Sequence, residues 1–155
     1  MSTMIGFSAL DSSLYIPELR LKRKESVLHE MVSRAHQAGI VRDADLLGET
    51  LMLRERVGST ALGKGVAVPQ ARSVAVMEPR LVVARSKRGI QWDAPDDLPV
   101  HIVLLALSPP ELSDEIYHDF VARAVAVGRL QRNRQKLIEA ESFEAVAAVL
   151  REVSA

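Results

Sequence analysis

Residues 58–72 read GSTALGKGVAVPQAR, and the character of this stretch changes halfway along. Its first part, 58–65, carries three glycines, which favour a loop because glycine adopts backbone conformations that other residues avoid. Val66–Val68 form a short apolar run typical of a buried strand, and Pro69 ends it because proline cannot donate a ladder hydrogen bond. We therefore expect a loop that leads into a short strand, with Gln70 directly after it.

Two helices are predicted on the N-terminal side of this stretch. Over residues 22–38 the apolar side chains recur at helical spacing, and Gly39 is suited to end the helix. Asp43 is predicted to cap a second helix that ends near Arg54. Residues 1–20 are expected to form an irregular or partly extended lead-in.

Strands and then helices are predicted on the C-terminal side. Arg80–Ala84 and Ile90–Trp92 are expected to be strands joined by a turn at Ser86–Gly89, and Asp93–Pro99 to be a loop. Val100–Leu107 is almost continuously apolar, as in a strand that is buried on both faces. Helices are expected from Ser113 or Asp114 onward, over 132–140 and over 142–153.

This order of elements predicts an α/β fold, a mixed β-sheet flanked by helices on both sides. The chain has 155 residues, which fits a single domain over 1–155.

The composition narrows the function classes. The net charge is zero and aromatic residues make up only 4% of the chain, so we expect no nucleic-acid partner. With no cysteine, thiol catalysis, disulfides and thiolate metal sites are excluded. The longest apolar run, Ile102–Leu107, is too short to cross a bilayer, and the N-terminus lacks the pattern of a secretory signal. We expect a cytoplasmic protein without membrane insertion.

Residues 58–72 resemble the active-site segment of phosphotransferase system (PTS) EIIA domains of the fructose, mannitol and nitrogen-regulatory class. The run Gly63–Pro69 is the specific part of the likeness. Three weaker anchors follow the family order: Leu53-Arg54-Glu55 before Ser59-Thr60, the strand 100–107 before Ser108-Pro109, and His118 at the start of a helix. The resemblance covers about Leu19 to the C-terminus and implies the family fold.

The resemblance also implies a role for each matching residue. In the family, a histidine after the Val/Ile-Pro step carries the phosphoryl group, and here Gln70 stands at that position. Arg54 matches an arginine that steadies the phosphoryl group, and His118 matches the second active-site histidine. Ser59 and Thr60 match hydroxyl and backbone donors near the acceptor. The loop glycines, Gly63 and Gly65, complete the implied anion-binding set. No cofactor and no metal ligand set is implied.

Each of these residues also has a purely structural interpretation. Arg54 at a helix end also complements the helix dipole. Ser59 and Thr60 are common turn residues, and glycines allow unusual turns whether or not a ligand binds. His118 near a helix start is compatible with plain surface. The basic run Arg20–Lys24 is either a solvated helix start or a docking patch for a partner.

Three functions follow from the resemblance. The amide nitrogen of Gln70 is a donor and a very poor nucleophile, so the first is a regulatory protein that binds a phosphocarrier-type or regulated target protein, or a small anion, without relaying phosphate. The second is a working phosphocarrier, with His118 as acceptor or with Gln70 an introduced replacement. The third is an interaction module with no ligand at the old site. The family is a phosphotransferase, but a lost acceptor points to an inactive chain.

Overall fold

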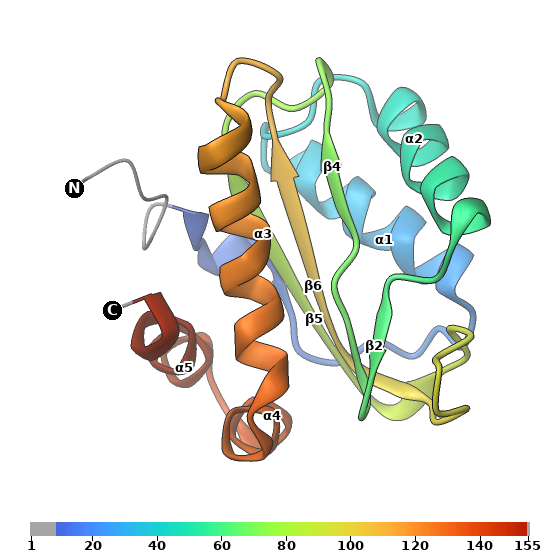
Figure 1. The fold of residues 1–155 in the computed structure, drawn as a ribbon, viewed down its shortest axis with the longest axis vertical. Helices are drawn as coiled ribbons and strands as arrows, with labels where there is room; N and C mark the ends of the chain where they lie inside the picture. Colours follow the sequence, from blue (N-terminus) through green and yellow to red (C-terminus); the bar gives the residue numbers. More distant parts are fainter. Residues whose placement is uncertain (1–8, 155) are drawn as a thin grey trace.

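The structure is a computed structural model that describes residues 9–154. Figure 1 shows its helices and strands. The N-terminal elements are a 3-10 helix (η2, Ser12–Leu14), β1 (Tyr15–Ile16), α1 (Lys24–Gln37) and α2 (Ala44–Val57). The strands that follow are β2 (Ala61–Gly63), β3 (Val66–Ala67), β4 (Gln70–Arg72), β5 (Arg80–Ile90) and β6 (Val100–Ser108). The C-terminal helices are α3 (Asp114–Arg129), α4 (Gln131–Glu139) and α5 (Phe143–Ser154).

The strands form one mixed sheet in the order β1-β5-β6-β3-β2, and β4 also pairs with β6. β5 lies antiparallel to β6, whereas β3 and β4 both run parallel to it. β3 pairs with Ile102 and Val103, and β4 pairs with the last three residues of β6, so the two short strands follow one another along the same side. β6 is therefore the strand on which the others are aligned.

Each face of the sheet has its own apolar core. Alternate residues of a strand point to opposite faces. Val103, Leu105 and Leu107 of β6 pack with side chains of α1 and α2, whereas Leu104 and Ala106 pack with α3, α4 and α5. Figure 1 shows α3 and α5 on one side of the sheet and α1 on the other. The predicted fold class, a mixed sheet with helices on both sides, is confirmed.

The predicted helix signals are also confirmed. The Asp43 side chain accepts a hydrogen bond from the N–H of Leu46, and that of Ser113 accepts one from Ile116. Gly39 follows the end of α1 with φ of 82°, a left-handed conformation that ends helices. The second helix is longer than predicted and ends at Val57 rather than near Arg54.

Two sequence predictions about strands were wrong, and one strand was not predicted. Residues 58–65 are not all loop, because Ala61–Gly63 pairs with β3 as a hairpin. The strand that begins at Val66 ends before Pro69, as predicted, but the sequence did not predict the separate strand β4, Gln70–Arg72, which pairs with the end of β6. Ser86–Gly89 is not a turn between two strands: β5 is continuous, and its register with β6 shifts between Arg85 and Ile90. Polar residues with a glycine suit a β-bulge as well as a turn, which explains the misreading. Of the predicted lead-in, residues 1–8 lie outside the described residues, and the rest contains η2 and β1.

Arg85 joins β5 to the C-terminal end of α4. Its side chain points from β5 and is buried, with 8% exposed. The guanidinium donates hydrogen bonds to the carbonyls of Ile138 and Ala140 at the C-terminal end of α4, and to that of Pro17 before α1. Carbonyls at a helix end lack partners within the helix and carry partial negative charge, so they suit a buried cation.

We predict that Arg85→Ala lowers the free energy of unfolding by about 3 kcal/mol, because three buried or partly buried carbonyls lose their donor. Denaturant unfolding measures this change. Arg42→Ala, at an exposed position, is the matched control and should change stability by no more than about 0.5 kcal/mol. Equal stabilities of the two variants would show that Arg85 does not hold α4 to the sheet.

Candidate functional site

Gln70 lies on β4, opposite Ala106 of β6, and its side chain is half-buried. The next residue, Ala71, packs into the core on the α1–α2 side. Because side chains alternate along a strand, Gln70 and Arg72 point to the other face, toward α3. β4 therefore presents an amide and a guanidinium side by side on the α3 face.

Arg72 connects this strand to the first turns of α3. Its Nη2 atom lies 2.7 Å from Oδ1 of Asp114, and its guanidinium lies over the ring of Tyr117, 4.9 Å from the ring centroid. The hydrogen bond and the charge of Arg72 lower the pKa of Asp114. Sequence reasoning did not select these three residues. The signal that could have found Arg72 is its place two residues after Gln70, on the same face of one strand.

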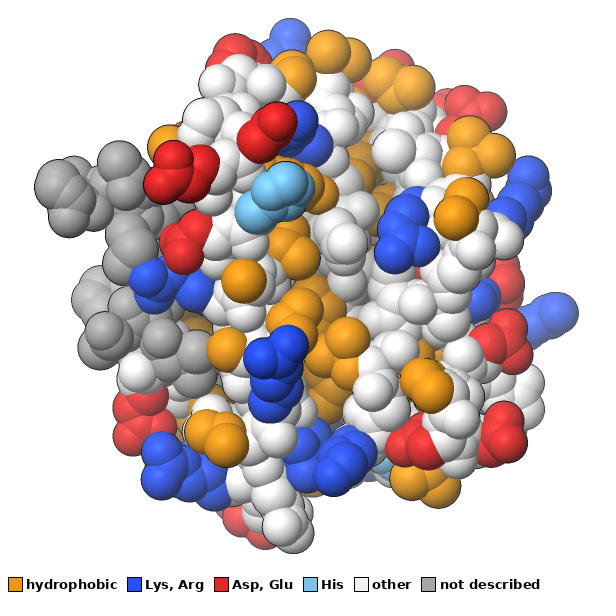
Figure 2. All heavy atoms as spheres, in the orientation of Figure 1, with side chains coloured by type: hydrophobic (Ala, Val, Ile, Leu, Met, Phe, Trp, Pro, Cys, Tyr) orange, Lys and Arg blue, Asp and Glu red, His pale blue; other side chains and the backbone are white. Residues whose placement is uncertain are grey.

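His118 and Arg54 lie near this cluster. The ring of His118 is exposed, and its centroid lies 5.8 Å from that of Tyr117. Burial raises the pKa of Tyr117, while the positive charges of Arg72 and Arg54 lower it, so Arg54 lies within electrostatic range of this ring. Arg54 also donates a hydrogen bond of 2.8 Å to the carbonyl of Gly58 at the end of α2, as its helix-end interpretation expects. Figure 2 shows this face, with a histidine (pale blue) near the upper end of α3 and hydrophobic side chains (orange) beside that helix.

Thr60 belongs to a buried hydrogen-bond network. Its hydroxyl donates to Oε2 of Glu55 and accepts from Nε1 of Trp92 at 3.2 Å, and its N–H donates to Oε1 of Glu55 at 3.2 Å. Lys24 lies 3.4 Å from the same carboxylate. Ser59 extends the network by donating to the carbonyl of Trp92. Both hydroxyls are therefore engaged within the scaffold, and neither forms a hydrogen bond with Gln70.

Gly63 and Gly65 shape the hairpin between β2 and β3. With Lys64 between them, they have φ of 92°, 57° and 85°, all in the left-handed region that favours glycine. The carbonyl of Gly65 accepts hydrogen bonds from the N–H groups of His101 and Ile102, at the start of β6. Gln70 is opposite Ala106, four residues further along and thus roughly 13 Å away. The structure does not bring these glycines to Gln70.

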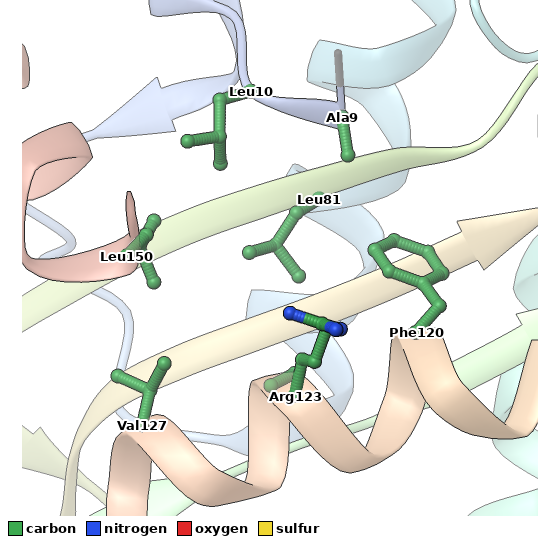
Figure 3. Close-up of a pocket in the computed structure, with 8 residues that line it drawn as sticks. Ala9, Leu10, Leu81, Phe120, Arg123, Val127 and Leu150 are labelled. Carbon is green, nitrogen blue, oxygen red and sulfur yellow. The ribbon is translucent and has the colours of Figure 1, made fainter. Parts of the chain in front are cut away.

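A small apolar cavity lies on the α3 face but away from these polar groups. It measures about 30 Å³ and lies between β5, α3 and α5. Figure 3 shows Leu81, Phe120, Val127 and Leu150 around it, with the side chain of Arg123 beside them. This volume has room for about one water-sized molecule and offers few polar partners, so we do not assign a ligand to it.

Two further findings concern only residues 9–154. No three His, Cys, Asp or Glu side chains gather closely enough to hold a metal ion. None of the helices combines the length and the apolar character that crossing a bilayer requires.

The fold and this site define a class of protein: a mixed α/β domain with a polar site where a short parallel strand meets the start of a helix. Residues 8–153 match the family described as phosphoenolpyruvate-dependent sugar phosphotransferase system, EIIA 2. The chain therefore belongs to this EIIA family, as the resemblance implied.

Relatives and solved structures agree with this assignment. The chain is 34% identical over 131 residues to the PTS system fructose-specific EIIA component of Haloferax volcanii, covering 84% of each chain. It is also 30% identical over 129 residues to the PTS system fructose-specific EIIABC component of Bacillus subtilis. That match covers 83% of this chain but only 20% of the much longer relative. The crystal structure of nitrogen regulatory protein IIA-Ntr from Neisseria meningitidis superposes with a TM-score of 0.84 at 25% identity, covering 93% of this chain and 97% of that one.

One of the solved structures with this fold is a complex. It contains enzyme IIA mannitol and phosphorylated enzyme IIB mannitol from Escherichia coli. One chain of that complex superposes on this protein with a TM-score of 0.77 at 17% identity. The superposition covers 92% of this chain and 97% of the chain in the complex. At this identity the comparison shows the shared fold alone.

We predict that Thr60→Val lowers the free energy of unfolding by about 2 kcal/mol, because the buried Glu55 carboxylate and Trp92 indole each lose a partner. Thr60→Ser keeps the hydroxyl and should keep most of the stability. Thermal or denaturant unfolding compares the two variants. Equal losses in both would show that the packing of the Thr60 methyl group, rather than the network, carries the stability.

A second prediction concerns the Asp114 carboxyl, whose pKa Arg72 lowers. A pKa that is lower in the folded state favours folding above the ordinary aspartate pKa, and this contribution is lost as the pH falls through the lowered value. Carboxyl-detected NMR titration should therefore show Asp114 titrating below the usual range, and Arg72→Gln should move its pKa upward. Arg54→Gln is the control and should leave it unchanged. If the pKa of Asp114 were the same in the wild type and in Arg72→Gln, the ion pair between Arg72 and Asp114 would be contradicted.

Proposed function

We propose that this chain is a cytoplasmic, single-domain EIIA-type protein that docks on a partner protein without relaying a phosphoryl group. The observation that carries the proposal is the amide of Gln70 at the position where the family resemblance expects the acceptor histidine. Phosphoryl transfer through a carrier needs an atom that can attack phosphorus. The amide nitrogen has no available lone pair, so it cannot form a useful phosphoramidate.

The surroundings of Gln70 support binding rather than transfer. Arg72 on the same strand face provides a guanidinium, which suits bidentate hydrogen bonding to an anionic group. In the unbound protein this guanidinium is already paired with Asp114, so an incoming anion would have to replace an existing ion pair. The proposed ligand is therefore first of all a protein partner, with a small anion at the remnant site as the minor part of the proposal.

A second function is favoured by one observation, the exposed imidazole of His118. A neutral imidazole keeps a nitrogen lone pair that can accept a phosphoryl group. Under this alternative the chain is a working phosphocarrier with a displaced acceptor. It predicts a covalent adduct on the unmodified chain, whereas the leading proposal predicts none.

The deciding experiment is intact mass spectrometry after incubation with the general phosphotransferase proteins and phosphoenolpyruvate. Three proteins are compared: the wild type, Gln70→His and Gln70→Asn. We expect an acid-labile phosphoryl adduct on Gln70→His alone, because only that variant regains a nucleophile on the unchanged scaffold. Gln70→Asn keeps an amide and controls for the change of side chain.

The other outcomes separate the alternatives. An adduct on the wild type that disappears in His118→Asn would establish the displaced acceptor and overturn the leading proposal. If none of the three proteins gains a phosphoryl group, the docking surface for the general phosphotransferase proteins is lost, and the assignment of Gln70 as the silencing residue fails.

A further inference from the structure

A cluster of basic side chains lies on the sheet edge outside β5. It consists of Arg20, Lys22 and Arg23 on the extended segment before α1, and Lys87 and Arg88 on β5; we call it the basic edge. All five side chains are exposed. Three of them, with Glu18 and Leu19, line a hollow of about 260 Å³.

Backbone pairing between the segment before α1 and β5 sets the positions of the residues of the basic edge. The N–H of Leu19 donates to the carbonyl of Arg85, and the N–H of Gln91 donates to that of Lys22. Arg23 and Gln91 form a parallel bridge. The segment therefore runs beside β5 in an extended conformation, and it holds Arg20 and Lys22 close to the basic residues of the strand.

The cations of the basic edge have no acidic partner among residues 9–154. Elsewhere in the protein, Arg72, Arg80 and Lys24 form ion pairs with carboxylates. No member of the basic edge forms an ion pair or a side-chain hydrogen bond with another described residue. In a chain of zero net charge, five unpaired cations in one place are a local excess of positive potential.

The segment that carries Arg20 and Lys22 also has unpaired backbone donors: the N–H groups of Arg20, Leu21 and Lys22 donate to no described residue. An extended edge with free donors can accept another extended chain as an added strand. Hydrogen bonds from the backbone would then give affinity, and the cations would select the side chains of the added chain.

Two of the charges are spaced along the extended segment. Arg20 and Lys22 are two residues apart, so they point to the same side and lie roughly 7 Å apart along the segment. Arg20 also lines the hollow with Lys87 and Arg88. Glu18 in the hollow opposes a compact anion there. Stacking of nucleobases needs exposed aromatic rings, and the nearby Trp92 is only 1% exposed. Carboxylates at alternate positions of an extended chain match this spacing of Arg20 and Lys22 better than either of these ligands does.

We infer that the basic edge binds an extended acidic segment of a partner protein, which adds to the sheet outside Arg20–Arg23. This surface is separate from Gln70. Gln70 and Leu81 are both opposite Ala106, and Lys87 lies six residues further along β5, roughly 20 Å away. Binding at the basic edge therefore does not depend on whether Gln70 or His118 takes part in phosphoryl transfer.

The test is fluorescence polarisation with a labelled decapeptide of alternating Glu and Thr, titrated with the full-length chain at low salt. The triple variant Arg20→Glu, Lys22→Glu and Lys87→Glu should bind at least about tenfold more weakly, because three attractive contacts become repulsive. The matched control, Arg42→Glu, Arg56→Glu and Arg132→Glu, changes three exposed cations elsewhere by the same net charge. It should bind within about twofold of the wild type.

A second probe separates strand addition from charge attraction alone. The same decapeptide with N-methylated alternate amides keeps its charge but cannot pair as a strand, so it should bind at least about tenfold more weakly. Equal binding of the methylated and unmethylated peptides would contradict the inference. So would equal loss in the two triple variants, or binding of a uridine oligonucleotide or anionic phosphatidylglycerol vesicles in preference to the peptide.

Discussion

The parallel and antiparallel pairing of β6 with its neighbours is the constraint on which the structure depends. This strand is buried along almost its whole length, so its register with each neighbour is set by apolar packing on both faces. A slip of one residue would exchange the two cores. The same register places Gln70 opposite Ala106 and Arg72 opposite Ser108, and so it aims both side chains at α3. The geometry of the site therefore follows from the pairing of β4 with a buried, largely apolar strand.

Local signals made the helices predictable. Asp43 and Ser113 cap helices through bonds that span three residues, and such short-range chemistry is visible in sequence. β4 was not predictable in the same way, because Pro69 is a true local signal for the end of a strand. Pairing resumes after it only because β6 offers free carbonyls and N–H groups at that level, and this information comes from residues more than 30 positions away.

The residues of the candidate site also fall into two groups: those that the sequence marks and those that only the fold brings together. Gln70, Arg54 and His118 could be selected from sequence because the family order of motifs marks them. The contact of Arg72 with Asp114 joins positions 42 apart, so it emerges only when α3 is placed against β4. Thr60 shows the converse. Its position in the motif suggested a donor at the site, while its hydroxyl completes a network under α2 with Glu55.

The network around Thr60 has a consequence for how this protein can be observed. Trp92 is the only tryptophan in the chain, and its indole is buried and hydrogen-bonded on the α1–α2 side of the sheet. Its fluorescence is therefore an intrinsic reporter of one face. The α3–α5 face carries Tyr15, Phe120 and Phe143 but no indole, so loosening of that layer alone would leave tryptophan emission unchanged. Comparing this emission with far-ultraviolet circular dichroism would distinguish separate melting of the two helical layers from a single cooperative transition.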